Sequence, residues 1–191
     1  SSPSSGDFVD ADGFDPGSGR LTFAQPGVGR WTIEQGQRII VEPTRNAGEA
    51  ELRLYTQGSA WGALGYQRGW AMWHGSAVSI AERVALFCGD SGKGKSTLAA
   101  ALAARGHPLV ADDLSRVDTD EGAIWPSAAR VKLWDSALDH FGWDAGGLAR
   151  DHFEDNRFHK PIDHIASRDG SLPLGAVFIL DWGERLEVER L

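Results

Sequence analysis

The sequence contains a single cysteine, Cys88, among its 191 residues. One thiol cannot form an internal disulfide, so the fold does not depend on a disulfide framework, and the composition fits a reducing compartment. Long apolar runs are also missing. Clean runs such as residues 176–180 are far shorter than the roughly 20 residues that cross a bilayer. The N-terminus lacks the basic and then apolar segments of a signal peptide. These absences predict a cytoplasmic protein without a membrane segment.

Positive charge is scarce. The chain has 19 lysines and arginines against 27 aspartates and glutamates, which gives a formal net charge of -8. A general nucleic-acid binder normally has a basic surface, so this balance argues against that class of function, although it is compatible with a local basic pocket for phosphates. Hydrophobic residues make up 41% of the chain and charged residues 24%, which is typical of a globular domain. The length predicts one domain with a core of its own and a small appendage.

The first part of the chain is Gly- and Ser-rich, and we expect residues 1–20 to form a loose arm. Residues 21–72 predict a β-rich subdomain. Short apolar strands are expected at 30–33 and 38–41, and the alternation over 51–55 predicts a further strand. Apolar residues at helical spacing after position 56 predict a helix that completes this subdomain.

Residues 73–191 predict an α/β domain. Strands are expected at 77–80 and 84–88, followed by a helix over 96–105 that ends at Gly106 and Pro108. A strand, a helix of about this length and a second strand are typical of a parallel or mixed α/β sheet. The second strand, a later helix and a last buried strand are expected at residues 109–111, 133–141 and 175–180.

The loop after strand 84–88 matches G-x-x-x-x-G-K-[ST], the Walker A pattern. Glycines let the backbone N–H groups approach a phosphate, and the following helix points its free N–H groups at the anion. Lys95 is expected to reach the β- and γ-phosphates, and the Ser96 hydroxyl is expected to bind Mg²⁺. We expect Lys93 to face solvent. The predicted ATP-binding residues are Gly89, Asp90, Ser91, Gly92, Lys93, Gly94, Lys95, Ser96 and Thr97.

Two carboxylates, Asp112 and Asp113, follow the predicted strand 109–111. If that strand lies beside the strand before the loop, both acids meet the phosphates at the carboxyl edge of the sheet. One acid can then hold Mg²⁺ while the other accepts a proton from an incoming hydroxyl. Asp181 ends another predicted strand and is a competing metal ligand.

Other polar residues are candidates for contacts with the phosphates or the substrate. His74 precedes strand 77–80 and could steady a phosphate or orient a carboxylate. Arg130 and Lys132 could bind the γ-phosphate or a substrate carboxylate, and so could the run at 157–160 with Arg157, His159 and Lys160. The alternative for these basic residues is an exposed, solvated surface.

Three elements resemble the kinase domain of HPr kinase/phosphorylase. They are His-Gly-Ser-Ala-Val at 74–78, the loop at 89–97, and Arg-Gly-His-Pro-Leu-Val-Ala-Asp-Asp at 105–113, in the family's order and at similar spacing. The resemblance is strong over about residues 70–120. It implies a P-loop kinase core, ATP and Mg²⁺ as cofactors, and a seryl hydroxyl of a protein as acceptor. Weaker similarity continues at 125–134 and 174–178.

The resemblance also implies roles for individual residues. Asp112 corresponds to the family's general base, and Asp113 helps to hold Mg²⁺ together with Ser96. His74 and Lys95 act at the phosphates.

The sequence differs in some features from the HPr kinase/phosphorylases of this family, which are bifunctional enzymes. Thr97 stands where they usually have glutamate, and residues 127–132 replace a signature segment. The β-rich N-terminal piece and Lys132-Leu133-Trp134 are more similar to the HPr kinase-like proteins of lasso-peptide gene clusters. Those proteins phosphorylate the C-terminal serine of a precursor peptide. They often run longer, so we expect a further C-terminal part.

The resemblance therefore implies a serine kinase that acts on a peptide or a small protein. Alternatives are an HPr-type protein kinase, a small-molecule or carboxykinase-like phosphotransferase, and a nucleotide-gated binding protein without catalysis. The sequence leaves the formation of a homo-oligomer open.

Overall fold

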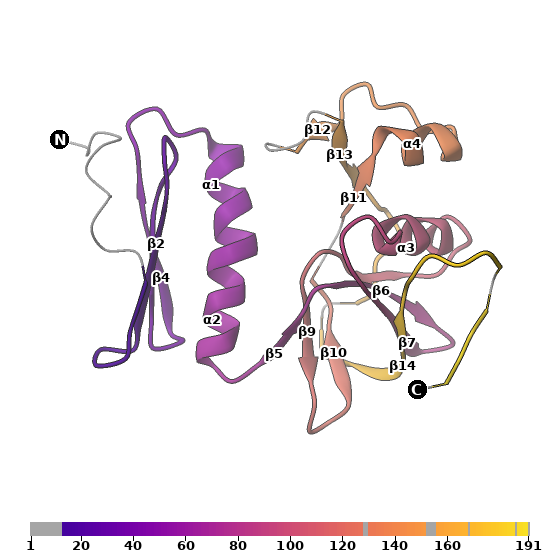
Figure 1. Cartoon of the computed structure of the whole chain (residues 1–191), viewed down its shortest axis with the longest axis horizontal. Coiled ribbons are helices and arrows are strands. Elements are labelled where there is room, and N and C mark those ends of the chain that lie inside the picture. Colours follow the sequence, from indigo (N-terminus) through magenta and orange to yellow (C-terminus); the bar gives the residue numbers. More distant parts are fainter. Residues whose placement is uncertain (1–12, 128–129, 152–155, 168, 186, 191) are drawn as a thin grey trace. The chain divides into compact units, whose positions relative to one another are not determined.

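The computed structural model describes residues 13–127, 130–151, 156–167, 169–185 and 187–190. The chain divides into two compact units with the boundary between Met72 and Trp73 (Figure 1). Within the described residues, no helix is both long enough and apolar enough to cross a bilayer.

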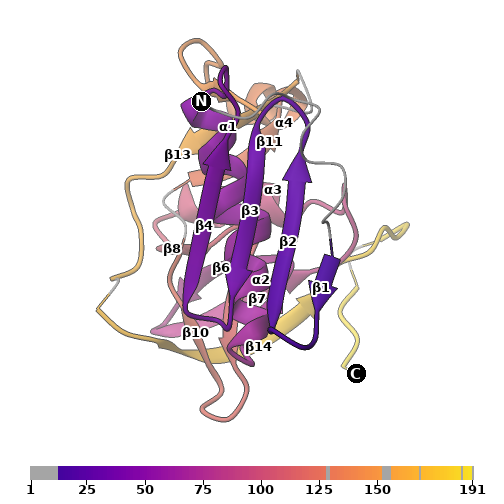
Figure 2. The ribbon, with the colours of Figure 1, turned by 90° about the vertical axis from the view of Figure 1, so that its left-hand side faces the viewer.

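The N-terminal unit contains a four-stranded antiparallel sheet whose strands follow one another in chain order (Figure 2). The first strand occupies part of the predicted arm, so the expectation of a loose segment is wrong from residue 13 onward. Residues 1–12 lie outside the described residues. The strands are β1 (Gly13–Asp15), β2 (Arg20–Gln25), β3 (Gly29–Glu34) and β4 (Arg38–Pro43).

One face of this sheet is covered by a continuous helical rod, formed by α1 (Glu49–Tyr55), the π-helical turn η1 (Thr56–Ala60) and α2 (Trp61–Gln67). Trp31 and Ile33 of β3 face the rod and are fully buried. The Trp31 indole N–H donates to Thr56 Oγ1 over 2.8 Å. The ring of Phe23 stacks on that of Trp31 at 5.3 Å between centroids.

Residues 51–55 are helical, so the predicted strand there is wrong. The Glu51 carboxylate accepts a hydrogen bond from the Gly48 N–H (3.2 Å), which satisfies a free donor at the start of the helix. Arg53 pairs with Glu49 at i,i+4 spacing over 2.6 Å. Leu52 and Tyr55 are three residues apart and both pack on the Trp31 cluster. Residues at this spacing share one face of a helix but lie on opposite faces of a strand.

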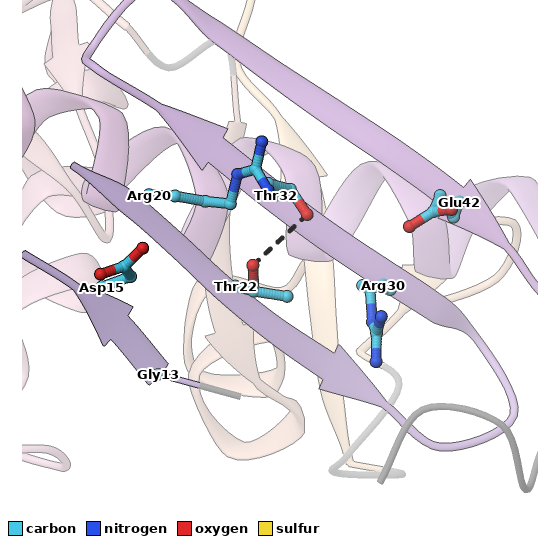
Figure 3. A pocket seen from close by; sticks show the side chains of 7 residues that line it. All are labelled: Gly13, Asp15, Arg20, Thr22, Arg30, Thr32 and Glu42. Carbon is cyan, nitrogen blue, oxygen red and sulfur yellow. Dashed lines mark hydrogen bonds between the residues drawn. The ribbon is translucent and has the colours of Figure 1, made fainter. Parts of the chain in front are cut away.

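The opposite face of the same sheet carries a pocket with mostly polar lining residues (Figure 3). The Thr22 and Thr32 hydroxyls lie 3.5 Å apart on neighbouring strands at its centre. None of the residues predicted for nucleotide binding or catalysis lines it. Its lining residues are Gly13, Asp15, Arg20, Thr22, Arg30, Thr32 and Glu42.

The C-terminal unit is built on a mixed sheet with the order β5-β9-β10-β14-β7-β6-β8. Strand β14 is parallel to β7, whereas β6 is antiparallel to both β7 and β8. The predicted α/β class with a mixed sheet is therefore confirmed. The strands are β5 (Ala71–Trp73), β6 (Gly75–Ile80), β7 (Arg83–Cys88), β8 (Leu109–Ala111), β9 (Ser115–Asp118), β10 (Ala123–Trp125) and β14 (Leu172–Ile179).

Helix α3 (Lys95–Ala103) follows β7 and packs Ala99 and Ala100 against the sheet. Its chain turns at Gly106, close to the predicted end. A second sheet has the order β11-β13-β12, from β11 (Arg130–Trp134), β13 (Arg157–Pro161) and β12 (Ala149–Arg150). Helix α4 (Asp135–Phe141) begins two residues later than predicted, because Leu133 and Trp134 end β11.

The sequence predicts a buried strand at 175–180, and this prediction is wrong for β14. Phe178 is 36% exposed and Ile179 61% exposed. Among the described residues, β14 pairs with β10 only at Leu172 and Pro173, the Leu174 N–H donates to the Gly122 carbonyl over 2.7 Å, and the residues after Leu174 pair with β7 alone. An apolar run therefore does not by itself indicate burial on both faces.

The buried Trp31 provides a test of the N-terminal unit. We expect Trp31→Ala to lower the free energy of unfolding by about 3–5 kcal/mol, because it removes a fully buried ring. Trp31→Phe should cost about 1–2 kcal/mol, mainly through the lost hydrogen bond to Thr56. Urea unfolding followed by circular dichroism measures both. The control is Trp182→Ala, since that side chain is 75% exposed; equal losses at positions 31 and 182 would contradict the described packing.

Candidate functional site

Three segments far apart in sequence meet at one edge of the mixed sheet. Because β6 runs antiparallel to β7 and β8, those two strands run in the same direction and end at the same edge. Strand β6 begins there, with Gly75 paired to Cys88 at the end of β7. Ala77 pairs with Ala111 at the end of β8. The phosphate loop, the acid pair and His74 therefore converge at this edge. Strand β6 lies between β7 and β8, so the two strands reach the same edge without being direct neighbours.

The phosphate loop has the backbone conformation that an anion site requires. Gly92 and Gly94 have φ values of 81° and 85°, and Gly94 directly precedes α3. Gly89 has a φ of 133°, and a Cβ there would lie 2.6 Å from the Leu180 carbonyl oxygen. Any larger residue would push the loop away from the end of β14. The N–H groups of the first turn of α3 have no earlier helical partner and can meet an anion.

The two lysines of the loop are in different environments. The Lys95 ammonium is buried and donates to the carbonyl oxygens of Gly89 and Asp90, each over 2.8 Å. Lys93 forms an ion pair with Asp181 and its side chain is only 22% exposed, so the expectation that Lys93 faces solvent is wrong. This pairing lowers the pKa of Asp181, whose side chain is 78% exposed. The carboxylate of Asp181 is therefore engaged by Lys93 of the loop.

Asp112 lies beside the Ser96 hydroxyl at the start of α3. Its Oδ1 accepts a hydrogen bond from Ser76 Oγ (2.6 Å), and its Oδ2 accepts one from the Lys132 backbone N–H (2.8 Å). Burial raises the pKa of Asp112, while hydrogen bonds from the Ser76 and Ser96 hydroxyls and from the Lys132 backbone N–H act in the opposite direction. The neighbouring charge of Asp113 raises it further.

Ser76 is a site residue to which the sequence assigns no role. Its side chain is fully buried, and its Oγ lies 3.4 Å from Ser96 Oγ. The available signal is a serine near the start of strand β6, directly after His74 and Gly75. That signal does not show that the hydroxyl faces the acid pair, because this depends on how β6 and β8 pair.

Asp113 has a different environment from Asp112. Its φ of 70° is unusual for a residue other than glycine and turns the chain between the two acids. Its side chain is 51% exposed, and its Oδ1 lies 3.6 Å from His74 Nδ1. Its Oδ2 lies 3.9 Å from Lys132 Nζ.

The three-stranded sheet adds a charged cluster next to Asp113, which we call the Lys132 cluster (Lys132, Asp151 and His159). Lys132 Nζ lies 2.9 Å from Asp151 Oδ2, and the Asp151 side chain is only 2% exposed. His159 pairs with Lys132 across β11 and β13, and its Nε2 lies 3.7 Å from the same Asp151 oxygen. Burial lowers the pKa of His159, and the charges of Arg130 and Lys132 lower it further.

The structure thus brings Lys132 and His159 to the site. Arg130 is two residues before Lys132 on β11, and its side chain is exposed. Arg157 instead lies over the Trp134 ring at 4.8 Å, and Lys160 lies 5.5 Å from the centre of the Trp143 ring. Asp151 gives no sequence signal, because its role depends on the pairing of β12 with β13.

The oxygen donors of the site fit Mg²⁺. Among the described residues there is no group of three or more His, Cys, Asp or Glu side chains that could hold a metal ion. Mg²⁺ commonly takes only one or two protein oxygens and completes its shell with phosphates and water. The Ser96 hydroxyl and the Asp112 carboxylate are such a pair, joined by one hydrogen-bond network.

Residues 69–132 match the family model of the HPr serine kinase C-terminal domain. This segment is HPr kinase-like. The match contains His74, the phosphate loop and the acid pair, and it ends at Lys132. The family resemblance stated from the motifs is therefore confirmed. Asp151 and His159 lie beyond the matched segment.

Known relatives support the same family. The HPr kinase/phosphorylase of Chlorobium luteolum is 34% identical over 119 residues, which cover 62% of this chain and 33% of that protein. That of Streptococcus thermophilus is 49% identical over 63 residues, or 31% of this chain and 20% of the relative. The chain thus spans about a third or less of the length of these HPr kinase relatives.

A solved structure, the HPr(Ser) kinase/phosphatase from Coxiella burnetii, aligns with 62% of this chain and 71% of its own. Its sequence identity is 19% and the TM-score is 0.39.

The raised pKa of Asp112 predicts a pH-dependent stability. The folded protein holds this proton more tightly than the unfolded chain, so the free energy of unfolding falls as pH rises through the folded-state pKa. Asparagine at this position does not titrate. Without nucleotide and metal, Asp112→Asn should melt at a higher temperature than the wild type at pH 8, and the difference should shrink at pH 4.5. Asp113→Asn is the matched control. A difference at position 112 that is independent of pH would refute the prediction.

Proposed function

We propose that this HPr kinase-like chain is a Mg²⁺- and ATP-dependent serine kinase that acts in the cytoplasm on a peptide or a small protein. The observation that carries the proposal is the hydrogen-bond network joining Ser96 of the phosphate loop, Ser76 and Asp112. It links a nucleotide-binding loop to a pair of acids, which is the combination that phosphoryl transfer needs. The family match over residues 69–132 supports the same reaction class.

The loop supplies the charge that a triphosphate requires. Its backbone N–H groups and Lys95 neutralise the β- and γ-phosphates when Lys95 exchanges the carbonyls of Gly89 and Asp90 for phosphate oxygens. Ser96 and Asp112 would hold Mg²⁺, which when bound neutralises charge on the phosphates. Such positioning and charge stabilisation provide most of the catalysis in phosphoryl transfer.

The contacts of the two acids support a division of roles opposite to the one that the resemblance implies. Asp112 is held at both carboxylate oxygens next to Ser96, which suits a metal ligand. Asp113 is half exposed, so an acceptor hydroxyl can approach it. We therefore assign proton acceptance to Asp113 and the Mg²⁺ contact to Asp112. His74, 3.6 Å from Asp113, orients the carboxylate of the base.

The Lys132 cluster lies on the acceptor side of this arrangement. Lys132 Nζ is 3.9 Å from Asp113 and is held by Asp151. Its ammonium can bind the transferred phosphoryl group or an anionic group of the acceptor, and the exposed Arg130 can add a second positive charge. Holding Lys132 through a buried carboxylate reduces the conformational entropy that it loses when the substrate binds.

Two acceptors with a seryl hydroxyl remain candidates. The resemblance of Lys132-Leu133-Trp134 and of the β-rich N-terminal unit to lasso-peptide kinases favours the C-terminal serine of a precursor peptide. The relatives named HPr kinase/phosphorylase favour HPr itself. Incubation with ATP, Mg²⁺ and each acceptor, followed by mass spectrometry for one added phosphoryl group, distinguishes them. A peptide ending in alanine is the control, and a wild-type chain that modifies neither acceptor refutes the proposed function.

Lys95 and Lys93 allow a matched test of nucleotide binding. We expect Lys95→Ala to weaken ATP binding by roughly 10- to 100-fold, because a charge-assisted contact with the phosphates is lost. Lys93→Ala removes the same charge from the same loop, but its ammonium is engaged by Asp181. The loss of ATP affinity in Lys93→Ala should therefore be several-fold smaller than in Lys95→Ala, measured in the same calorimetric titration. A larger loss at position 93 would show that the roles of the two lysines are reversed.

The roles of the acids can be separated by comparing binding with transfer. Asp113→Asn should bind Mg²⁺ and ATP nearly as the wild type does, yet transfer should fall by about 10²- to 10⁴-fold, since the base is lost. Asp112→Asn should weaken the Mg²⁺-dependent part of nucleotide binding. The opposite pattern would restore Asp112 as the base. Calorimetry and single-turnover transfer to the identified acceptor provide the two measurements.

A further inference from the structure

We propose that Ser76 is a positioning residue that holds the Asp112 carboxylate beside the Ser96 hydroxyl and so determines how tightly the site binds Mg²⁺ together with a nucleotide. The inference rests on the nucleotide and Mg²⁺ site of the proposed function. It adds a residue that neither the phosphate-loop pattern nor the pair of acids includes.

The direction of the hydrogen bonds follows from the chemistry of the three groups. Ser76 Oγ lies 2.6 Å from Asp112 Oδ1 and 3.4 Å from Ser96 Oγ. An ionised carboxylate only accepts hydrogen bonds, so Ser76 uses its single proton on Asp112. The lone pairs of Ser76 are then available to accept from Ser96. The single proton of Ser96 is then donated either to Ser76 or directly to Asp112, and both arrangements keep the Ser96 hydroxyl beside the carboxylate.

Both arrangements suit a metal ligand. A hydroxyl that offers a lone pair to a cation must point its proton elsewhere, and Ser76 and Asp112 are acceptors beside Ser96. Asp112 is fixed at its other oxygen by the Lys132 backbone N–H over 2.8 Å. The carboxylate is thus held by β6 on one side and β11 on the other. Outer groups of this kind orient metal ligands, and their loss typically weakens metal binding.

Ser76 could instead be a small residue that only fills space in the sheet. Ser115 of β9 allows this to be tested, because its side chain is also fully buried and its hydroxyl donates to the Gly75 carbonyl (3.3 Å) rather than to either acid. Ser115→Ala therefore reports the cost of losing a buried hydroxyl near β6. Ser76→Cys nearly preserves the size of the side chain but supplies a much weaker donor.

The experiment is a calorimetric titration of the full chain with ADP, with and without Mg²⁺, and it needs no acceptor. In Ser76→Ala we expect the Mg²⁺-dependent gain in ADP affinity to fall roughly 10-fold or more, with Mg²⁺-free affinity changed by less than about twofold. Ser76→Cys should lose most of the gain as well. Ser115→Ala should keep it.

Several outcomes would overturn the inference. The first is a Mg²⁺-dependent gain in ADP affinity that is as large in Ser76→Ala as in the wild type. The second is a loss of this gain in Ser115→Ala that equals the loss in Ser76→Ala. The third is a wild-type gain in Ser76→Cys, which would show that only the size of the side chain matters. If Ser76→Ala does not fold, Ser76→Cys decides by the same criterion. A wild type without any Mg²⁺ response refutes both the inference and the metal part of the proposed function. Failed transfer to every acceptor with an intact Mg²⁺ response refutes the kinase alone.

Discussion

Strand β6 lies between β7 and β8 and runs against both of them. This pairing brings the end of the phosphate-loop strand, the end of the acidic strand and the start of β6 to one edge of the sheet. It also decides which residue of β6 reaches the acids, because a shift of one residue would turn Ser76 to the other face. One backbone register, that of β6 with β7 and β8, therefore brings together the Asp112 carboxylate, the Ser96 hydroxyl and His74.

Consecutive acids would ordinarily share an environment and repel each other, but here the chain turns sharply between them. The positive φ of Asp113 leaves Asp112 among hydroxyl and N–H donors and leaves Asp113 in solvent beside His74 and Lys132. A left-handed conformation costs a residue such as aspartate about 1–2 kcal/mol. That cost is consistent with a site in which one carboxylate must meet a cation and the next must remain accessible.

Local features could be predicted from the sequence and long-range features could not. The strand, loop and helix around Gly89 and Lys95 depend on neighbouring residues, and so their pattern is visible in the chain. The pairing of Ser76 with Asp112 and of Lys132 with Asp151 depends on strand register and on a second sheet. Residues 51–55 show that even local patterns conflict, since capping and ion-pair signals there outweigh a short alternation. That His74, the phosphate loop and the acid pair belong to one site could be predicted only from their resemblance to HPr kinases.

The exposed part of β14 has a consequence for the chain in solution. Beyond Leu174, its backbone pairs on one side only among the described residues, and Val177, Phe178 and Ile179 are open to water. A bare strand edge with apolar side chains is a template for adding a strand from another molecule. The net charge of -8 opposes such contact by repulsion between molecules, and salt screens that repulsion over about 10 Å at 0.1 M. Solubility will therefore decrease as ionic strength increases.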